Sequence, residues 1–107
     1  MSERLQQLRA MLVDEPGDAF LRYAIALEVK RAGHFAEAIA DLEALLKDQP
    51  DHIASYYQLA VLLADLGRTQ EAIEACEAGA LHCVVSGDRK ARAELLALKE
   101  TLEDAIG

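Results

Sequence analysis

Apolar residues recur at intervals of three and four along most of this chain, which is the spacing of one face of an α-helix. The clearest stretch lies between residues 56 and 73. Its apolar positions are Tyr56, Leu59, Ala60, Leu63 and Leu66. Gly67 then stops the helix, and a second helix is expected after Thr69. The stretch therefore predicts a helical hairpin.

Capping residues divide the whole chain into about six expected helices. Ser2, Asp18, Asp51, Thr69 and Asp88 each carry a side-chain oxygen that can accept a hydrogen bond from the first turn of a helix. The expected helices cover about residues 2–13, 18–32, 36–48, 51–66, 70–85 and 88–106. The apolar stripes of the first and last helices consist of Leu5, Leu8, Met11, Leu12, Ala91, Leu95, Leu98, Leu102 and Ile106. The chain is predicted to be all-α.

The sequence also repeats itself with a period of 34 residues and no insertion. The recurring pairs are Pro16 and Pro50, Ala26 and Ala60, Gly33 and Gly67, Ala38 and Ala72, and Ile39 and Ile73. Self-similarity at a fixed period of this length is typical of proteins built by stacking one helical unit on the next. We therefore expect equivalent hairpins, each packed on its neighbour.

The period and its small residues resemble the tetratricopeptide repeat, whose pattern is W-x2-L-G-x2-Y, then A-x3-F, then P. The matching residues of the first copy are Arg22, Ile25, Ala26, Val29, Ala38, Leu42 and Pro50. Those of the second copy are Tyr56, Leu59, Ala60, Leu63, Ala72 and Cys76, with Val84 in place of the proline. The match is firm at the small residues and the turn glycines and degenerate at the large aromatic residues.

This resemblance implies a right-handed α-superhelix of stacked antiparallel hairpins in a single domain, residues 1–107. Residues 1–16 would form an N-terminal capping helix, 17–50 and 51–84 two repeats, and 88–106 a C-terminal capping helix. The small residues have a physical role, because two helices approach closely only where one presents a small side chain. Gly79 lies inside an expected helix at a cost of roughly 1 kcal/mol relative to alanine. We expect the final helix to approach it.

Composition limits the kinds of partner. The net charge of −8 and the isoelectric point near 4.7 disfavour unaided binding to nucleic acid or to an anionic membrane. No apolar run reaches the roughly 18 residues of a membrane span, and no signal peptide is evident, so a cytoplasmic location is expected. Cys76 and Cys83 lie about 10.5 Å apart along one expected helix, too far for a disulfide. Reduced thiols are expected.

Catalytic and metal-binding patterns are missing from the sequence. The potential metal ligands, His34, His52, His82, Cys76 and Cys83, are not spaced at helical i+3 or i+4 intervals. No phosphate loop, serine elbow or C-x-x-C pair is present. We therefore predict no metal, no cofactor and no enzyme activity. A reactive thiol at Cys83, near a helix end, is the one catalytic alternative left open.

The first helix of each expected repeat carries two apolar stripes, so one stripe needs cover beyond its own hairpin. In the family that the chain resembles, these helices line the concave face, where partner peptides commonly lie. Carried over, the inner face consists of Phe20, Tyr23, Leu27, Lys30 and Arg31, with Ala54, Tyr57, Val61, Ala64 and Asp65 in the second repeat. Tyrosines are favoured anchors at binding surfaces.

Three interpretations of this apolar stripe are open. The first is a protein-binding module that holds a partner peptide or helix through Phe20, Tyr23, Leu27, Lys30, Arg31, Tyr57 and Val61. The second is a homodimer in which the same face is buried between two copies. The third is ordinary core packing, with the stripe covered by a neighbouring helix. A large exposed apolar patch usually marks an interface, so the binding module is the leading hypothesis and the homodimer is its alternative.

Overall fold

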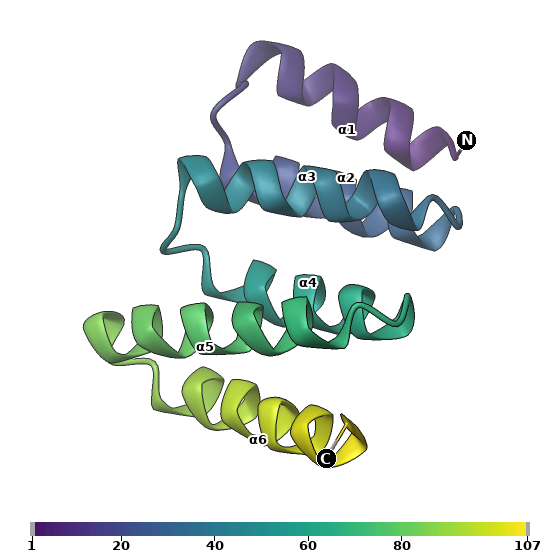
Figure 1. Ribbon diagram of the computed structural model, residues 1–107. Helices are drawn as coiled ribbons and strands as arrows, with labels where there is room; N and C mark the ends of the chain where they lie inside the picture. The colour runs from purple at the N-terminus through teal and green to yellow at the C-terminus, as the bar shows by residue number, and fades with distance from the viewer. Residues whose placement is uncertain (1, 107) are drawn as a thin grey trace. The chain divides into compact units, whose positions relative to one another are not determined.

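The computed structural model describes residues 2–106, and its secondary structure in that range is entirely helical. In chain order the helices are α1 (Glu3–Asp14), α2 (Ala19–Arg31), α3 (Phe35–Asp48), α4 (Ile53–Asp65), α5 (Thr69–Ser86) and α6 (Arg89–Ile106) (Figure 1). The prediction of six helices and no strand is therefore confirmed over the described residues. The ends of the predicted domain, Met1 and Gly107, lie outside them.

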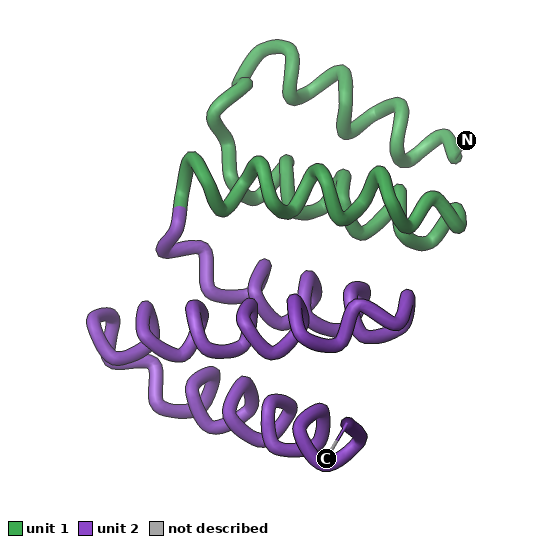
Figure 2. The backbone as a smooth tube through the Cα atoms, in the orientation of Figure 1, with its two compact units in different colours: residues 1–49 green, residues 50–107 purple. Residues whose placement is uncertain are grey.

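The chain divides into two compact units, Met1–Gln49 and Pro50–Gly107 (Figure 2). The first contains α1, α2 and α3, and the second contains α4, α5 and α6. Pro50 opens the second unit at the point where the repeat pattern places a proline. Proline has no backbone N–H and blocks continuation of a helix, so it suits this boundary.

In the first unit, α2 packs against both α1 and α3. Ser2 accepts a hydrogen bond from the Leu5 N–H at 3.1 Å, and Asp18 accepts one from the Leu21 N–H at 3.1 Å, as the capping pattern predicts. The core residues of this unit are Leu5, Leu8, Leu21, Ile25, Ala26, Val29, Ala38, Ile39, Leu42 and Leu45. The spacing of three and four residues thus places one apolar stripe of each helix inside the unit.

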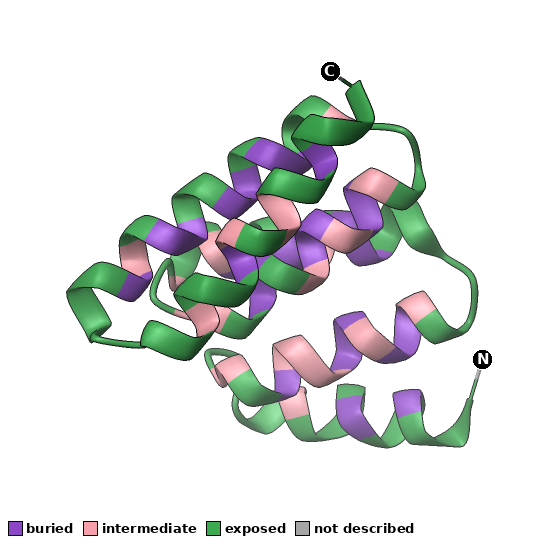
Figure 3. Cartoon of the chain, turned by 90° about the horizontal axis from the view of Figure 1, so that it is seen from below, coloured by how far each residue is buried: buried purple, intermediate pink, exposed green. Residues whose placement is uncertain are grey.

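In the second unit, α5 packs against both α4 and α6. Gly87 ends α5 with a φ of 76°, and Asp88 accepts a hydrogen bond from the Ala91 N–H at 3.0 Å to start α6, as predicted. The core residues are Tyr56, Leu59, Ala60, Leu62, Leu63, Ala72, Ile73, Ala75, Cys76, Ala80, Cys83, Leu95 and Leu102. Figure 3 shows such buried residues as stripes along the helices, with exposed residues over the remaining surface.

The small residues of the repeat lie where the helices meet. Ala26, Ala38, Ala60 and Ala72 are all buried. Gly79 is also buried, and an added Cβ there would lie 2.7 Å from the Tyr56 Cβ of α4 and 2.9 Å from a Leu95 methyl of α6. The expected approach by the final helix is therefore present, but the closest neighbour is α4.

Two predicted caps are wrong. α4 starts at Ile53, so His52 rather than Asp51 precedes it, and the His52 Nδ1 lies 2.7 Å from the Ser55 hydroxyl. α5 starts at Thr69 itself, after Arg68. Both helices begin without a side-chain cap from the expected residue, because the chain enters them from turns held by backbone hydrogen bonds.

Two predicted stripe positions are also wrong, since Met11 and Ile106 are exposed. Each lies in the terminal helix of its unit. α1 packs mainly on α2, and α6 packs mainly on α5. A helix with few neighbours buries a narrower stripe than periodicity alone suggests.

Candidate functional site

The outward face of α2 carries the residues predicted to bind a partner in the first unit. Phe20 is 70% exposed, Tyr23, Leu27 and Lys30 are partly exposed, and Arg31 is exposed. The other stripe of the same helix, Leu21, Ile25 and Val29, is buried as expected. The structure thus separates a core stripe from an accessible one on α2, and Phe20 is the most exposed large apolar side chain of that accessible stripe.

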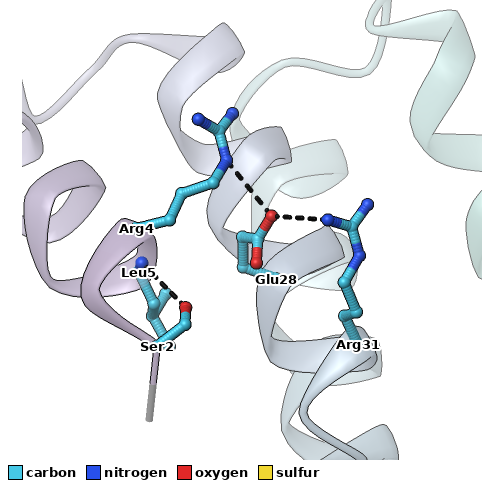
Figure 4. Close-up of polar contacts among 5 residues, drawn as sticks. All are labelled: Ser2, Arg4, Leu5, Glu28 and Arg31. Atoms are coloured by element: carbon cyan, nitrogen blue, oxygen red, sulfur yellow. Dashed lines mark hydrogen bonds and ion pairs between the residues drawn. The ribbon is translucent and has the colours of Figure 1, made fainter.

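Arg31 already forms an ion pair within the chain. Its Nη1 donates to the Glu28 Oε1 at 3.1 Å, and the Arg4 Nε of α1 donates to the same oxygen at 3.2 Å (Figure 4). Glu28 is only 8% exposed, whereas both arginine side chains are mostly in solvent. A partner carboxylate at Arg31 would therefore compete with Glu28. The i,i+3 spacing of Glu28 and Arg31 was visible in the sequence, but the contact with Arg4 was not.

α4 carries the corresponding face of the second unit. Tyr57 is 39% exposed and Val61 is partly exposed, while Leu59, Ala60 and Leu63 of the same helix are buried. Of the remaining predicted positions, Ala54 and Asp65 are exposed and Ala64 is partly exposed. The core and accessible stripes are therefore distinct on α4 as well. The union of the α2 and α4 faces in one concave groove stays a prediction.

A cavity of about 230 Å³ lies within the first unit, among α1, α2 and α3. Its lining residues are Arg9, Leu12, Arg22, Ile25, Glu37, Asp41 and Ala44. Arg9 donates to Glu37 at 3.3 Å, and Arg22 donates to Asp48 at 2.9 Å. Burial, and then the Glu37 carboxylate, raise the pKa of Asp41, while Arg9 and Arg22 oppose that shift. These ion pairs link α1 and α2 to α3, so the charges around the cavity have a structural role.

The cysteines are both free and buried. Burial raises the pKa of Cys76 to about 11, and burial also raises the pKa of Cys83. Cys83 is buried although it lies near the end of its helix, because α5 continues to Ser86 and packs against α6. Burial and a raised pKa both disfavour the thiolate that nucleophilic chemistry requires, so the structure gives the reactive-thiol hypothesis no support.

His52 and His82 each contact a neighbouring side chain. The His82 ring stacks on Tyr56 with centroids 5.7 Å apart, and His52 contacts Ser55. Within residues 2–106, no three His, Cys, Asp or Glu side chains gather in a way that could hold a metal ion. No helix described in the structure is both long and apolar enough to cross a membrane.

A family model and a solved structure both relate this chain to tetratricopeptide repeat proteins. The family model of the tetratricopeptide repeat matches residues 23–81. A solution structure of a tetratricopeptide repeat domain protein from Salinibacter ruber is 34% identical, covers 83% of this chain and 90% of that chain, and superposes with a TM-score of 0.80. No curated protein sequence matches the chain.

Two further solved structures share the fold. A solution structure of a protein from Bordetella parapertussis is 26% identical, covers 99% of this chain and 94% of that chain, and has a TM-score of 0.82. The TPR2B domain of yeast Sti1, in complex with pHsp70, is 19% identical, covers 94% of this chain and 81% of that chain, and has a TM-score of 0.85. Together, the matched repeat, the helical hairpins and the buried small residues show that this chain belongs to the tetratricopeptide repeat family.

Proposed function

We propose that the chain is a non-catalytic protein-interaction module that binds a peptide or helix of another protein. The proposed partner-binding residues are Phe20, Tyr23, Leu27, Lys30 and Arg31 on the accessible face of α2, and Tyr57 and Val61 on that of α4. The observation that carries the proposal is the exposure of Phe20 on a helix whose other stripe is fully buried. An aromatic side chain held in water on a rigid helix has apolar surface available for a partner.

The family supports this role, since tetratricopeptide repeats commonly act as protein-interaction modules. The structure of yeast Sti1 TPR2B is itself a complex with pHsp70. Tyrosine also suits binding surfaces, because its ring buries a large area while its hydroxyl can still find a hydrogen-bond partner. A cytoplasmic location fits the two free thiols, which persist in reducing compartments.

A binding assay with paired variants tests the proposal. Wild-type protein is used to capture partners from native lysate, and a captured protein is then purified and its affinity measured by fluorescence anisotropy. We expect the Phe20→Ala, Tyr57→Ala double variant to lose affinity at least about tenfold, as for interface anchors. Phe35→Ala is the matched control, because Phe35 is exposed on α3, outside both faces.

Two results would contradict the proposal. One is equal affinity of the double variant and wild type for every purified partner. The other is an equal loss with Phe35→Ala, which would indicate non-specific adhesion to exposed aromatic side chains. Circular dichroism must show that each variant retains its helices, so that loss of binding is not loss of fold.

Self-association is the competing proposal for the same faces. A homodimer would bury Phe20 and Tyr57 of both copies, and its mass in solution would depend on concentration. Sedimentation equilibrium of wild type beside Tyr57→Asp separates the two proposals. A wild-type dimer that the substitution converts to monomer favours self-association, whereas a wild-type monomer favours a free binding face.

A further inference from the structure

A groove in the second unit is distinct from the α4 face of the same unit. It runs between α5 and α6 and has a volume of about 340 Å³. The lining residues are Glu77, Ala80, Leu81, Val84, Arg92, Leu96 and Lys99. None of them belongs to α4, whose face carries Tyr57 and Val61. The groove therefore needs its own explanation.

The apolar part of the groove is unusually exposed. Leu81 is 70% exposed and Val84 is 62% exposed, and the neighbouring Val85 is 89% exposed. These side chains lie in the last two turns of α5, which continues through Val84, where the repeat pattern has proline, to Ser86. The departure from the repeat thus extends α5 and places aliphatic surface in water beside α6. Contiguous aliphatic exposure of this kind usually marks a contact surface.

The groove also has charged lining residues, Glu77, Arg92 and Lys99. α6 begins with Arg89, Lys90 and Arg92 in its first turn, where the helix dipole disfavours cations. None of these three side chains has an ion pair with another residue of the described chain. Lys99, which also lines the groove, is different because it pairs with Glu77 at 3.2 Å. Arg92 is therefore the lining cation that is available to an incoming anion.

We propose that the α5–α6 groove docks an acidic amphipathic segment of another protein. Aliphatic side chains of that segment cover Leu81, Val84 and Leu96, and a carboxylate of the same segment pairs with Arg92. Charge complementarity carries the choice of partner, since Arg92 lines this apolar groove without an ion pair to the described residues, on a protein whose net charge is −8.

A protein segment fits better than the two other occupants. An anionic membrane is a broad charged surface that would meet the negative charge of the rest of the chain, whereas a short segment contacts only the groove around Arg92. A second copy of the chain brings the same net charge of −8, so the two copies repel one another at long range. Both remain outcomes of the test.

Peptide selection tests the docking site without knowledge of the natural partner. A displayed library of random peptides of about 15 residues, enough for four helical turns, is selected on the wild-type chain. The selected peptides are synthesised, and their affinities are measured for Leu81→Ser, for Arg92→Glu and for the Phe20→Ala, Tyr57→Ala variant. Val13→Ser and Lys47→Glu are the matched controls, because both residues are exposed in the first unit.

We expect a class of selected peptides that combines aliphatic and acidic residues. Their affinity falls at least about tenfold with Leu81→Ser and with Arg92→Glu, and it weakens as salt is added. Both controls and the Phe20→Ala, Tyr57→Ala variant bind these peptides as wild type does. That last result separates this site from the proposed α2 and α4 faces, so either proposal can fail alone.

Several results overturn the inference. The inference fails if no selected peptide loses affinity with both Leu81→Ser and Arg92→Glu. It also fails if the peptides that do lose affinity contain no acidic residues. Sedimentation with vesicles of equal parts phosphatidylcholine and phosphatidylglycerol tests the membrane. If the wild-type chain binds these vesicles, Arg92→Glu abolishes that binding and the selection yields no acidic peptide, the groove binds lipid instead. A wild-type dimer that Leu81→Ser dissociates assigns it to a second copy.

Discussion

Gly79 of α5 faces Tyr56 of α4 so closely that a Cβ at Gly79 would lie 2.7 Å from the Tyr56 Cβ and 2.8 Å from its Cγ. The Tyr56 ring is fixed on its other sides, since its hydroxyl donates to the Pro50 carbonyl at 2.6 Å and the ring stacks on His82. The glycine is therefore required by the packing of the hairpin, and its low helix propensity is the accompanying cost.

Gly79→Ala is expected to destabilise the protein. Alanine improves helix propensity by about 1 kcal/mol, but the added methyl group forces α4 and α5 apart, and overpacking of this kind costs about 1–3 kcal/mol or more. We expect a net loss of about 1–2 kcal/mol in urea unfolding. Gly17→Ala is the control, since no atom lies within 4 Å of an added Cβ there. A Gly79→Ala variant as stable as Gly17→Ala would contradict the account.

Glu28→Gln is expected to loosen α1. The substitution keeps the shape of the side chain but removes the charge that receives hydrogen bonds from Arg4 and Arg31. Because both arginines are largely in solvent, we expect a loss of only about 1 kcal/mol. Amide hydrogen exchange should rise within Glu3–Asp14 more than within α3. Glu43→Gln, on the exposed face of α3, should change neither quantity.

Cys76 predicts an alkaline loss of stability. Its pKa is raised from 9.0 to about 11 in the folded chain, so between these values the unfolded chain has lost the proton while the folded chain keeps it. Stability then falls as the pH rises through this window, by up to about 2–3 kcal/mol. Urea unfolding across the window measures the slope. Cys76→Ala should be less stable near neutral pH but should show a smaller alkaline decline, and an unchanged decline would contradict the prediction.

Asp41→Asn is expected to stabilise the protein at neutral pH. The folded chain raises the pKa of this carboxyl above its ordinary value of 3.8, chiefly through burial and then through Glu37. The ionised form is therefore disfavoured, and its cost appears as the pH rises through that region. The variant should unfold at a higher temperature than wild type at neutral pH and at the same temperature at a pH well below 3.8. A lower unfolding temperature at neutral pH would show that Arg9 and Arg22 outweigh burial.

Local signals in the sequence were sufficient for the helices. Ser2, Asp18 and Asp88 cap helices as their side-chain chemistry predicts, and Gly33, Gly67 and Gly87 adopt the positive φ that ends them. These features depend on neighbours within a few residues. His52 and Arg68 escaped prediction because they stand before helices without a side-chain cap that would mark them.

For the candidate faces, periodicity distinguished the core stripe from the accessible stripe but did not show which residues of other helices contact them. It distinguished Leu21 and Ile25 in the core from the accessible Phe20 on the same helix, because the angular position of a residue is set by its place in the sequence. It did not reveal that Arg31 is paired with Glu28 and that Arg4 joins them from α1. Pairing between residues 24 positions apart depends on how the helices pack.

The sequence alone determined the all-α class, the repeat and the small residues at which helices meet, since these follow from spacing and local backbone preference. Only the tertiary structure decided which helix approaches Gly79, that Cys83 is buried, and that Leu81 and Val84 border a groove beside Arg92. The physical reason is that burial depends on the neighbours a helix face receives. Periodicity gives the direction of a side chain, whereas packing decides what lies in that direction.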